Sequence, residues 1–133
     1  AGPAAAELPG LPPGALQFQR LLRARRQWDE VGAAYGRSAD EIGDAEWEGT
    51  RAFIRSFYKV GEDMEFLAGG MKGETKTKAV QLSRDFRRFV RSLDKPLIDK
   101  DLDGFRKGHA QAKSMVEGFF ALLEEASDIP EEI

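Results

Sequence analysis

The stretch Asp44–Met71, DAEWEGTRAFIRSFYKVGEDMEFLAGGM, carries the clearest structural signal in the sequence. Most of its large apolar residues recur at spacings of three, four and seven, which places them on one face of a helix. They are Trp47, Phe53, Ile54, Phe57, Val60, Met64, Leu67 and Met71. A glycine cluster at 69–73 follows and indicates a turn, since glycine adopts left-handed backbone angles at little cost. We therefore predict an amphipathic helix over 44–71, with Asp44 as its N-cap.

Three other stretches repeat this helical spacing. They predict helices over about 15–42, 75–98 and 101–126, and Pro96 is expected to kink or end the 75–98 helix near 93–95. No window between turn residues alternates apolar and polar residues, which argues against strands. Helices joined by short turns pack beside their predecessors in the opposite direction. We therefore predict an all-α fold, an antiparallel up-down four-helix bundle over 15–133 with an aromatic core.

Residues 1–14, AGPAAAELPGLPPG, are expected to form no helix. They hold four of the six prolines, and proline lacks the backbone donor and clashes with the preceding helical turn. We predict an extended, Pro-rich N-terminal arm. Two interpretations stay open: a floppy terminus, or a docking strand in which Pro9, Pro12 and Pro13 lower the entropy cost of ordering on a partner.

The composition excludes several classes of protein. The 133 residues include no cysteine and one histidine, His109, which excludes disulfides, zinc fingers, iron–sulfur clusters and any site of two imidazoles. The net charge of −3 argues against general nucleic-acid binding, and no run approaches the ~20 apolar residues of a membrane-spanning helix. We place His109 on the polar side of its helix, as a surface or hydrogen-bonded side chain.

No motif for catalysis or metal binding is complete. Asp99–Gly104 is similar to the start of an EF-hand loop, but the twelfth position, where that loop needs a glutamate, is Ala110. We expect these aspartates to cap the following helix, with weak cation binding left open. No serine follows a strand-to-helix elbow, and no glycine loop has the spacing of a phosphate-binding loop. We predict no enzymatic activity, no metal site and no cofactor.

Charge is unevenly distributed along the chain. Residues 72–98 include eight basic and three acidic residues, whereas 99–133 include four basic and nine acidic residues. Basic residues recur at helical spacing opposite the apolar stripe of the 75–98 helix, namely Arg84, Arg88, Arg91 and Lys95. Arg23 belongs to a similar row on the first helix. These rows are either solvated faces with intramolecular salt bridges or docking surfaces for an acidic protein partner.

Six short elements follow one another in a definite order over about 44–130. They are Trp47-x3-Arg51, Gly61-Glu62-Asp63-Met64-x2-Leu67, Lys78-Ala79, Leu93-Asp94, Lys100-Asp101 and Phe119-Phe120-x-Leu122-Leu123. Trp28 and Val31 stand at compatible places in the first helix. In order and spacing this set resembles the PsbQ-type extrinsic subunits of photosystem II, including the forms of red algae and the diatom lineage, and the Pro-rich start is also similar to that family.

The resemblance implies a non-enzymatic, PsbQ-like protein of the chloroplast thylakoid lumen, peripheral to the membrane and monomeric on its own. Such a subunit would dock on the intrinsic subunits of photosystem II beside the other extrinsic subunits. It would stabilise the oxygen-evolving complex and help retain calcium and chloride, without itself supplying ligands to the manganese cluster.

Two alternatives stay open beside that expectation. One is a generic helical protein-interaction module from another system. The other is a small-molecule or cofactor-binding bundle with a cavity among Trp28, Trp47 and the phenylalanines.

Overall fold

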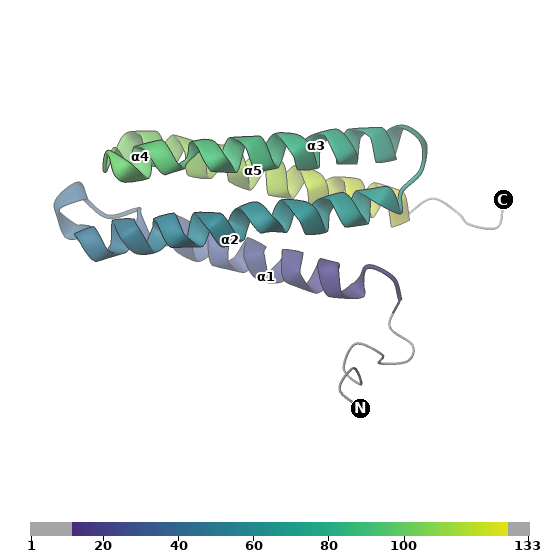
Figure 1. Ribbon diagram of the computed structural model, residues 1–133, viewed down its shortest axis with the longest axis horizontal. Coiled ribbons are helices and arrows are strands. Elements are labelled where there is room, and N and C mark those ends of the chain that lie inside the picture. The colour runs from purple at the N-terminus through teal and green to yellow at the C-terminus, as the bar shows by residue number, and fades with distance from the viewer. Residues whose placement is uncertain (1–11, 128–133) are drawn as a thin grey trace, which may run out of the picture.

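Four long helices form the body of the protein in the computed structural model, which describes residues 12–127 (Figure 1). They are α1 (Ala15–Ala34), α2 (Asp44–Gly69), α3 (Gly73–Ser92) and α5 (Leu102–Ser127). A 3-10 turn, η2 (Ala39–Glu41), follows α1, and a short helix, α4 (Asp94–Ile98), continues from α3. Residues 12–127 include no β-strand, so the predicted all-α fold is confirmed. Pro9 and the rest of the arm up to residue 11 lie outside the described residues.

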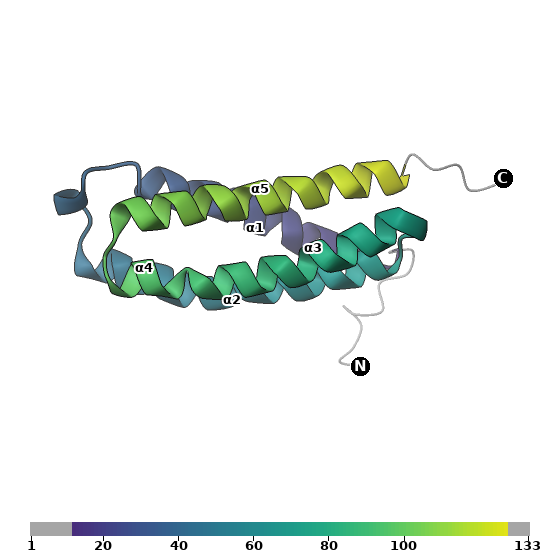
Figure 2. The ribbon, with the colours of Figure 1, turned by 90° about the horizontal axis from the view of Figure 1, so that it is seen from above.

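The long helices are arranged as a four-cornered antiparallel bundle. Each contacts two neighbours: α1 lies against α2 and α5, and α3 lies against the same two helices. Viewed from above, α3 and α4 run along α2 while α5 runs along α1 (Figure 2). Short turns join α2 to α3 and α4 to α5, so each helix reverses direction and packs beside its predecessor. The predicted up-down four-helix bundle is therefore confirmed.

The first helix ends earlier than predicted, at Ala34 rather than residue 42. Its last carbonyls bind arginine side chains: Arg37 Nε donates to the Ala34 carbonyl at 2.8 Å, and Arg106 Nε donates to the Tyr35 carbonyl at 2.8 Å. These bonds satisfy acceptors that a longer helix would have paired internally. Ile42 matches the helical spacing and is buried, but it reaches the core from an extended backbone beyond η2.

The second helix begins as predicted, but Asp44 is not its N-cap. Gly43 holds that position, and its N–H donates to Glu46 Oε1 at 3.2 Å. Glu46 lies three residues into the helix, from where its side chain can reach back to the N-cap amide. Asp44 is instead the first helical residue, and its Oδ1 accepts a hydrogen bond from Lys100 Nζ at 2.7 Å.

The predicted break near Pro96 is confirmed, because α3 ends at Ser92 and α4 begins at Asp94. Pro96 lies in the first turn of α4, where its missing N–H has no helical acceptor to lose. The α4 helix then ends in a Schellman motif: the Asp101 N–H donates to the Pro96 carbonyl at 2.8 Å, and Lys100 adopts the left-handed conformation with φ 53°.

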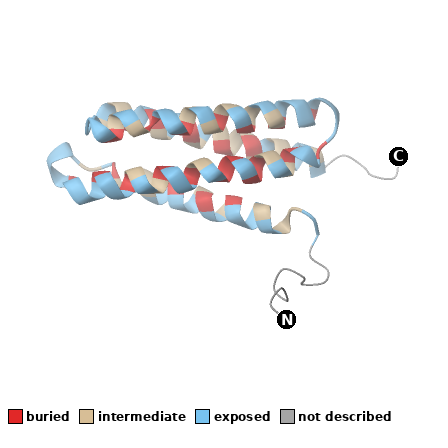
Figure 3. Ribbon diagram, in the orientation of Figure 1, coloured by how far each residue is buried: buried red, intermediate tan, exposed pale blue. Residues whose placement is uncertain are grey.

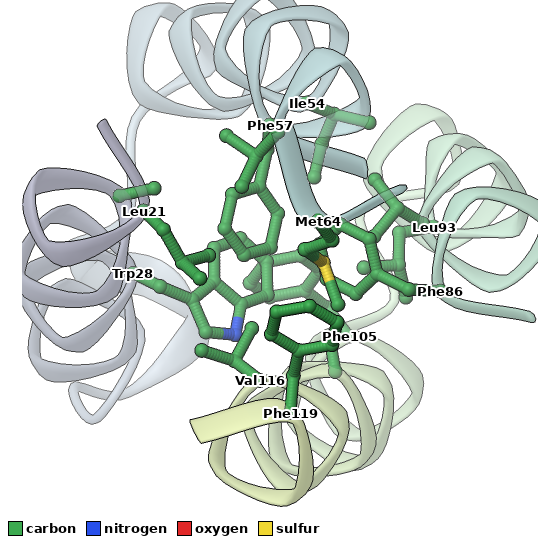
Figure 4. Close-up of a cluster of buried hydrophobic side chains, with 14 of the residues drawn as sticks. Leu21, Trp28, Ile54, Phe57, Met64, Phe86, Leu93, Phe105, Val116 and Phe119 are labelled. Atoms are coloured by element: carbon green, nitrogen blue, oxygen red, sulfur yellow. The ribbon is translucent and has the colours of Figure 1, made fainter. Parts of the chain in front are cut away.

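The core follows the predicted apolar stripes, and buried and exposed positions alternate along each long helix (Figure 3). Its largest fully buried side chains come from all four long helices and meet along the bundle axis (Figure 4). They include Trp28, Phe57, Phe86, Phe105, Phe119, Leu21 and Met64. The Trp28 ring stacks on Phe57 with centroids 4.3 Å apart. Aromatic residues therefore fill the core, as predicted.

No helix within residues 12–127 is both long enough and apolar enough to cross a membrane.

Candidate docking surface

The cationic row predicted on the 75–98 helix is present on the outer surface of α3 and α4. Arg84, Arg88 and Lys95 expose 58%, 77% and 82% of their side chains. Three residues of this row also lie next to acidic groups of the same molecule. Arg88 Nη1 lies 3.3 Å from Asp85, Lys95 Nζ lies 2.8 Å from Asp99, and Arg84 Nη2 lies 4.0 Å from Glu65.

These short-range pairs offset part of the positive charge of the row. The hydrogen bond from Lys95 to Asp99, followed by the charge of Asp99, raises the pKa of the Lys95 ammonium, so it stays protonated. Exposed ion pairs contribute little to stability and exchange readily with other partners. The row is thus partly paired and fully accessible, which is compatible with both interpretations made from the sequence.

Arg91 is the member of the row that the fold holds most firmly. Its guanidinium lies over the ring of Tyr58 on α2, 5.0 Å from the centroid, and its Nη2 donates to Tyr58 Oη at 3.1 Å. A cation–π contact and a neutral hydroxyl orient a guanidinium without neutralising it. Arg91 therefore presents an oriented charge at the seam between α2 and α3.

A second cationic row, on α2, lies across this seam. Arg51, Arg55 and Lys59 follow one another at intervals of four residues and so share one side of the helix. Arg51 is already engaged, because its Nε donates to Asp94 Oδ1 at 2.9 Å. Arg55 and Lys59 are exposed, and neither makes an ion pair within the described part of the chain.

The α2 row and Arg91 line a surface groove of about 390 Å³, here called the α2–α3 groove. Its lining has four cationic and two anionic side chains over a partly apolar floor. The lining residues are Arg51, Ile54, Arg55, Tyr58, Lys59, Glu62, Arg91 and Asp94. Of the predicted docking residues, only Arg91 lines this groove, while Arg84, Arg88 and Lys95 lie elsewhere on α3 and α4.

Arg23 belongs to α1 and lies beside α2 on the side where α1 packs against it. It lines a groove of about 360 Å³ between α1 and α2, together with Arg20, Asp63 and Lys59. Arg20 is bound there to the buried Asp63, with Nη2 2.7 Å from Oδ1, which ties α1 to α2. Lys59 lines both grooves, so α2 separates Arg23 from the α3 row.

Sequence reasoning missed the contribution of α2 to this surface. The signal was present, since Arg51-x3-Arg55-x3-Lys59 is a basic row at helical spacing. It stands within a region of mixed charge, where Glu48, Glu62 and Asp63 mask it in any count of net charge. Only the packing of α2 against α3 shows that this row adjoins Arg91.

The prolines predicted as docking residues are described in part. Pro12 and Pro13 are exposed in the turn that leads into α1, and the Pro12 carbonyl accepts a hydrogen bond from the Ala15 N–H at 3.1 Å. Pro9 lies outside the described residues, so the predicted docking strand stays a prediction.

Of the acidic residues at 99–103, Asp101 caps α5, while Asp99 pairs with Lys95 and Asp103 lies in the first turn of α5. Asp101 Oδ1 accepts a hydrogen bond from the Gly104 N–H at 3.0 Å, at the start of α5, which confirms the predicted capping role. Within residues 12–127, no three histidine or carboxylate side chains are grouped as they would be around a metal ion.

His109 is hydrogen-bonded, as predicted, but it does not lie on the polar side of its helix. Its ring stacks on Trp28 with centroids 4.4 Å apart, and its Nε2 lies 2.7 Å from the Trp28 carbonyl oxygen. Burial lowers the pKa of the imidazole, and the bond to that carbonyl opposes the effect only in part. The rings of His109, Phe53 and Phe57 pack around Trp28, and this packing gives a cofactor cavity beside that tryptophan no support.

Searches of known protein-family models, of curated proteins and of solved structures found no match to this chain.

Proposed function

We propose that this protein is a non-enzymatic subunit that docks through its basic face on an acidic surface of a larger assembly. One observation carries the proposal: Arg84, Arg88, Arg91 and Lys95 form an exposed cationic row on the rigid α3–α4 segment of a protein whose net charge is negative. Local charge of one sign on such a background orients an approaching partner and accelerates its encounter.

The resemblance described above makes the lumenal side of photosystem II the assembly to test first. There the bundle would act as a PsbQ-like extrinsic subunit, peripheral to the thylakoid membrane. A rigid bundle bound to lumenal loops would reduce their local opening and thereby slow the loss of calcium and chloride. The basic row supports docking, and the aromatic core supports rigidity.

Reversing two charges of the row tests this proposal. The variant Arg88→Glu/Arg91→Glu should keep the helical circular dichroism of the wild type, because both side chains are exposed. Its affinity for salt-washed photosystem II particles at low ionic strength should fall by roughly tenfold or more, since each attraction becomes a repulsion. If the affinity of the double variant is unchanged, the basic row does not contribute to docking.

A generic helical interaction module is the second candidate, since the same exposed basic row would dock on an acidic surface outside photosystem II. It has the same fold and the same basic row but no affinity for photosynthetic membranes. Adding the wild-type protein back to salt-washed particles separates the two candidates, because only the first predicts binding that restores oxygen release.

A further inference from the structure

The α2–α3 groove differs from the cationic row on α3 and α4, where three of the four cations lie next to carboxylates of the same molecule. Arg51 and Asp94 bind each other at one end of the groove. The other three cations that line it, Arg55, Lys59 and Arg91, have no carboxylate partner within residues 12–127. Because α2 and α3 are antiparallel neighbours, these three charges come from both sides of the groove.

Within the groove, Arg91 is oriented by Tyr58. The guanidinium lies over the Tyr58 ring and also donates a hydrogen bond to the Tyr58 hydroxyl. A guanidinium held in this way keeps donors free for a carboxylate, which it binds through two parallel hydrogen bonds. Less side-chain entropy is lost on binding when the cation is already oriented.

The remaining lining limits which anion fits. Ile54 is buried beneath the groove and Tyr58 is half-buried, so part of the floor is apolar. Glu62 on α2 lies toward one end of the groove, and Asp94 on α4, bound to Arg51, lies toward the other. Both carboxylates would repel a dense negative charge such as a phosphate cluster or an anionic membrane. Isolated carboxylates next to an apolar side chain match this lining better.

This inference rests on the proposed function, because the groove adjoins the basic row that we propose to dock on an acidic partner. We infer that the α2–α3 groove binds an acidic segment of the partner protein, with a carboxylate between Arg55 and Arg91 and an adjacent apolar side chain over Ile54 and Tyr58. Lys59 contributes a further cation at the Glu62 end. The docking contact is then centred on the seam of α2 and α3 rather than on α3 alone.

A peptide titration followed by NMR tests the inference without the large assembly. The probe is acetyl-Glu-Phe-Asp-Leu-Glu-amide, added to the isotopically labelled full chain at low salt. The matching amide peptide, acetyl-Gln-Phe-Asn-Leu-Gln-amide, controls for the apolar residues. Sodium phosphate and phosphatidylglycerol vesicles are titrated separately, to compare a phosphate ion and an anionic membrane with the acidic peptide at the same amides.

The test pair is Arg55→Gln/Lys59→Gln, and the charge-matched control is Lys76→Gln/Lys78→Gln on α3. None of these four side chains makes a hydrogen bond or an ion pair in the part of the chain that the structure describes, so both variants should keep the fold. We expect the acidic peptide to shift the amides of Arg55, Tyr58 and Arg91. The affinity should fall roughly three- to thirtyfold in the test pair, the range for two partly exposed ion pairs, and less than twofold in the control.

Four results would overturn the inference. They are equal losses in the two pairs, equal binding of the amide peptide, no localised shifts with the acidic peptide, and shifts at these amides only with phosphate or vesicles. Failure of the proposed function is distinct from all four: the wild-type protein would not bind photosystem II particles, while its titration with the acidic peptide would be unaffected.

Discussion

At the scale of single residues, Trp28 and His109 join α1 to α5 through a reciprocal pair of contacts. Trp28 Nε1 donates to the His109 carbonyl at 3.1 Å, while His109 Nε2 lies 2.7 Å from the Trp28 carbonyl. Both bonds are partly buried, so leaving a donor or acceptor of the pair unsatisfied would cost free energy. We call this pair of contacts the Trp28–His109 clamp. Burial lowers the pKa of its imidazole and so favours the neutral ring, while the bond to the Trp28 carbonyl offsets part of that effect.

The clamp predicts a pH dependence of stability with a definite sign. The pKa of His109 is lowered from 6.5 in the folded protein, so the unfolded chain takes up a proton first as the pH falls. The free energy of unfolding should therefore be greatest above about pH 6.5 and should decrease below it, until the folded protein is protonated as well. Asp29 opposes this effect and Lys113 reinforces it.

Urea unfolding between pH 5.5 and 7.5 measures this dependence. His109 is the only histidine in the chain, so His109→Gln should abolish most of the slope in this window. A wild-type slope that persists in His109→Gln would contradict the assignment.

The clamp also leaves no room for a side chain at Gly32, because a Cβ there would overlap the His109 ring. We expect Gly32→Ala to push the ring off Trp28 and to destabilise the protein by about 1–3 kcal/mol, the usual cost of overpacking. Gly49→Ala is the matched control, since nothing lies within 4 Å of its Cβ; it should stabilise α2 by about 0.5–1 kcal/mol. Thermal unfolding of the two variants distinguishes them, and equal effects would contradict the packing described.

At the scale of elements, Arg106 holds the connection between α1 and α2 onto α5. Its Nε donates to the Tyr35 carbonyl at 2.8 Å and its Nη2 donates to the Arg37 carbonyl at 2.7 Å. Tyr35 anchors the same segment from inside, where its hydroxyl donates to Thr50 Oγ1 at 2.7 Å. The connection at 35–43 is therefore a fixed part of the bundle end.

Truncating Arg106 should loosen this end and leave the rest of the bundle folded. We expect Arg106→Ala to destabilise the protein by roughly 1–3 kcal/mol, since two hydrogen bonds from a charged donor are lost. Amide hydrogen exchange should accelerate over 35–43 and stay unchanged in α3. Lys107→Ala, at an exposed neighbouring site, is the control, and equal acceleration in that variant would contradict this role of Arg106.

The helices were predictable from sequence because their signals are local. The spacing from Trp47 to Met64 and the break at Pro96 depend on neighbouring residues, and both appear in the structure. The end of α1 was not predictable in this way, because Arg106 binds the Tyr35 carbonyl from 71 positions away along the chain. The pairing of Arg91 with Tyr58 depends on tertiary packing for the same reason.

At the scale of the whole molecule, different residues supply stability and the proposed binding. The buried aromatic residues hold the bundle together, while the exposed, ion-paired cations of the row on α3 and α4 contribute little to its stability. Raising the ionic strength should therefore weaken docking far more than it changes the thermal midpoint, because surface charges are screened within about 10 Å at 0.1 M salt. Parallel measurements of rebinding and of thermal unfolding across a salt series check this, and equal sensitivity of both would contradict it.

Binding of the wild-type protein to salt-washed photosystem II particles tests the proposed function most directly. The account predicts saturable binding at low salt, progressive release as salt is added, and recovery of oxygen evolution in proportion to the protein bound. Absence of binding at low salt, or binding without any recovery of oxygen release, would contradict it.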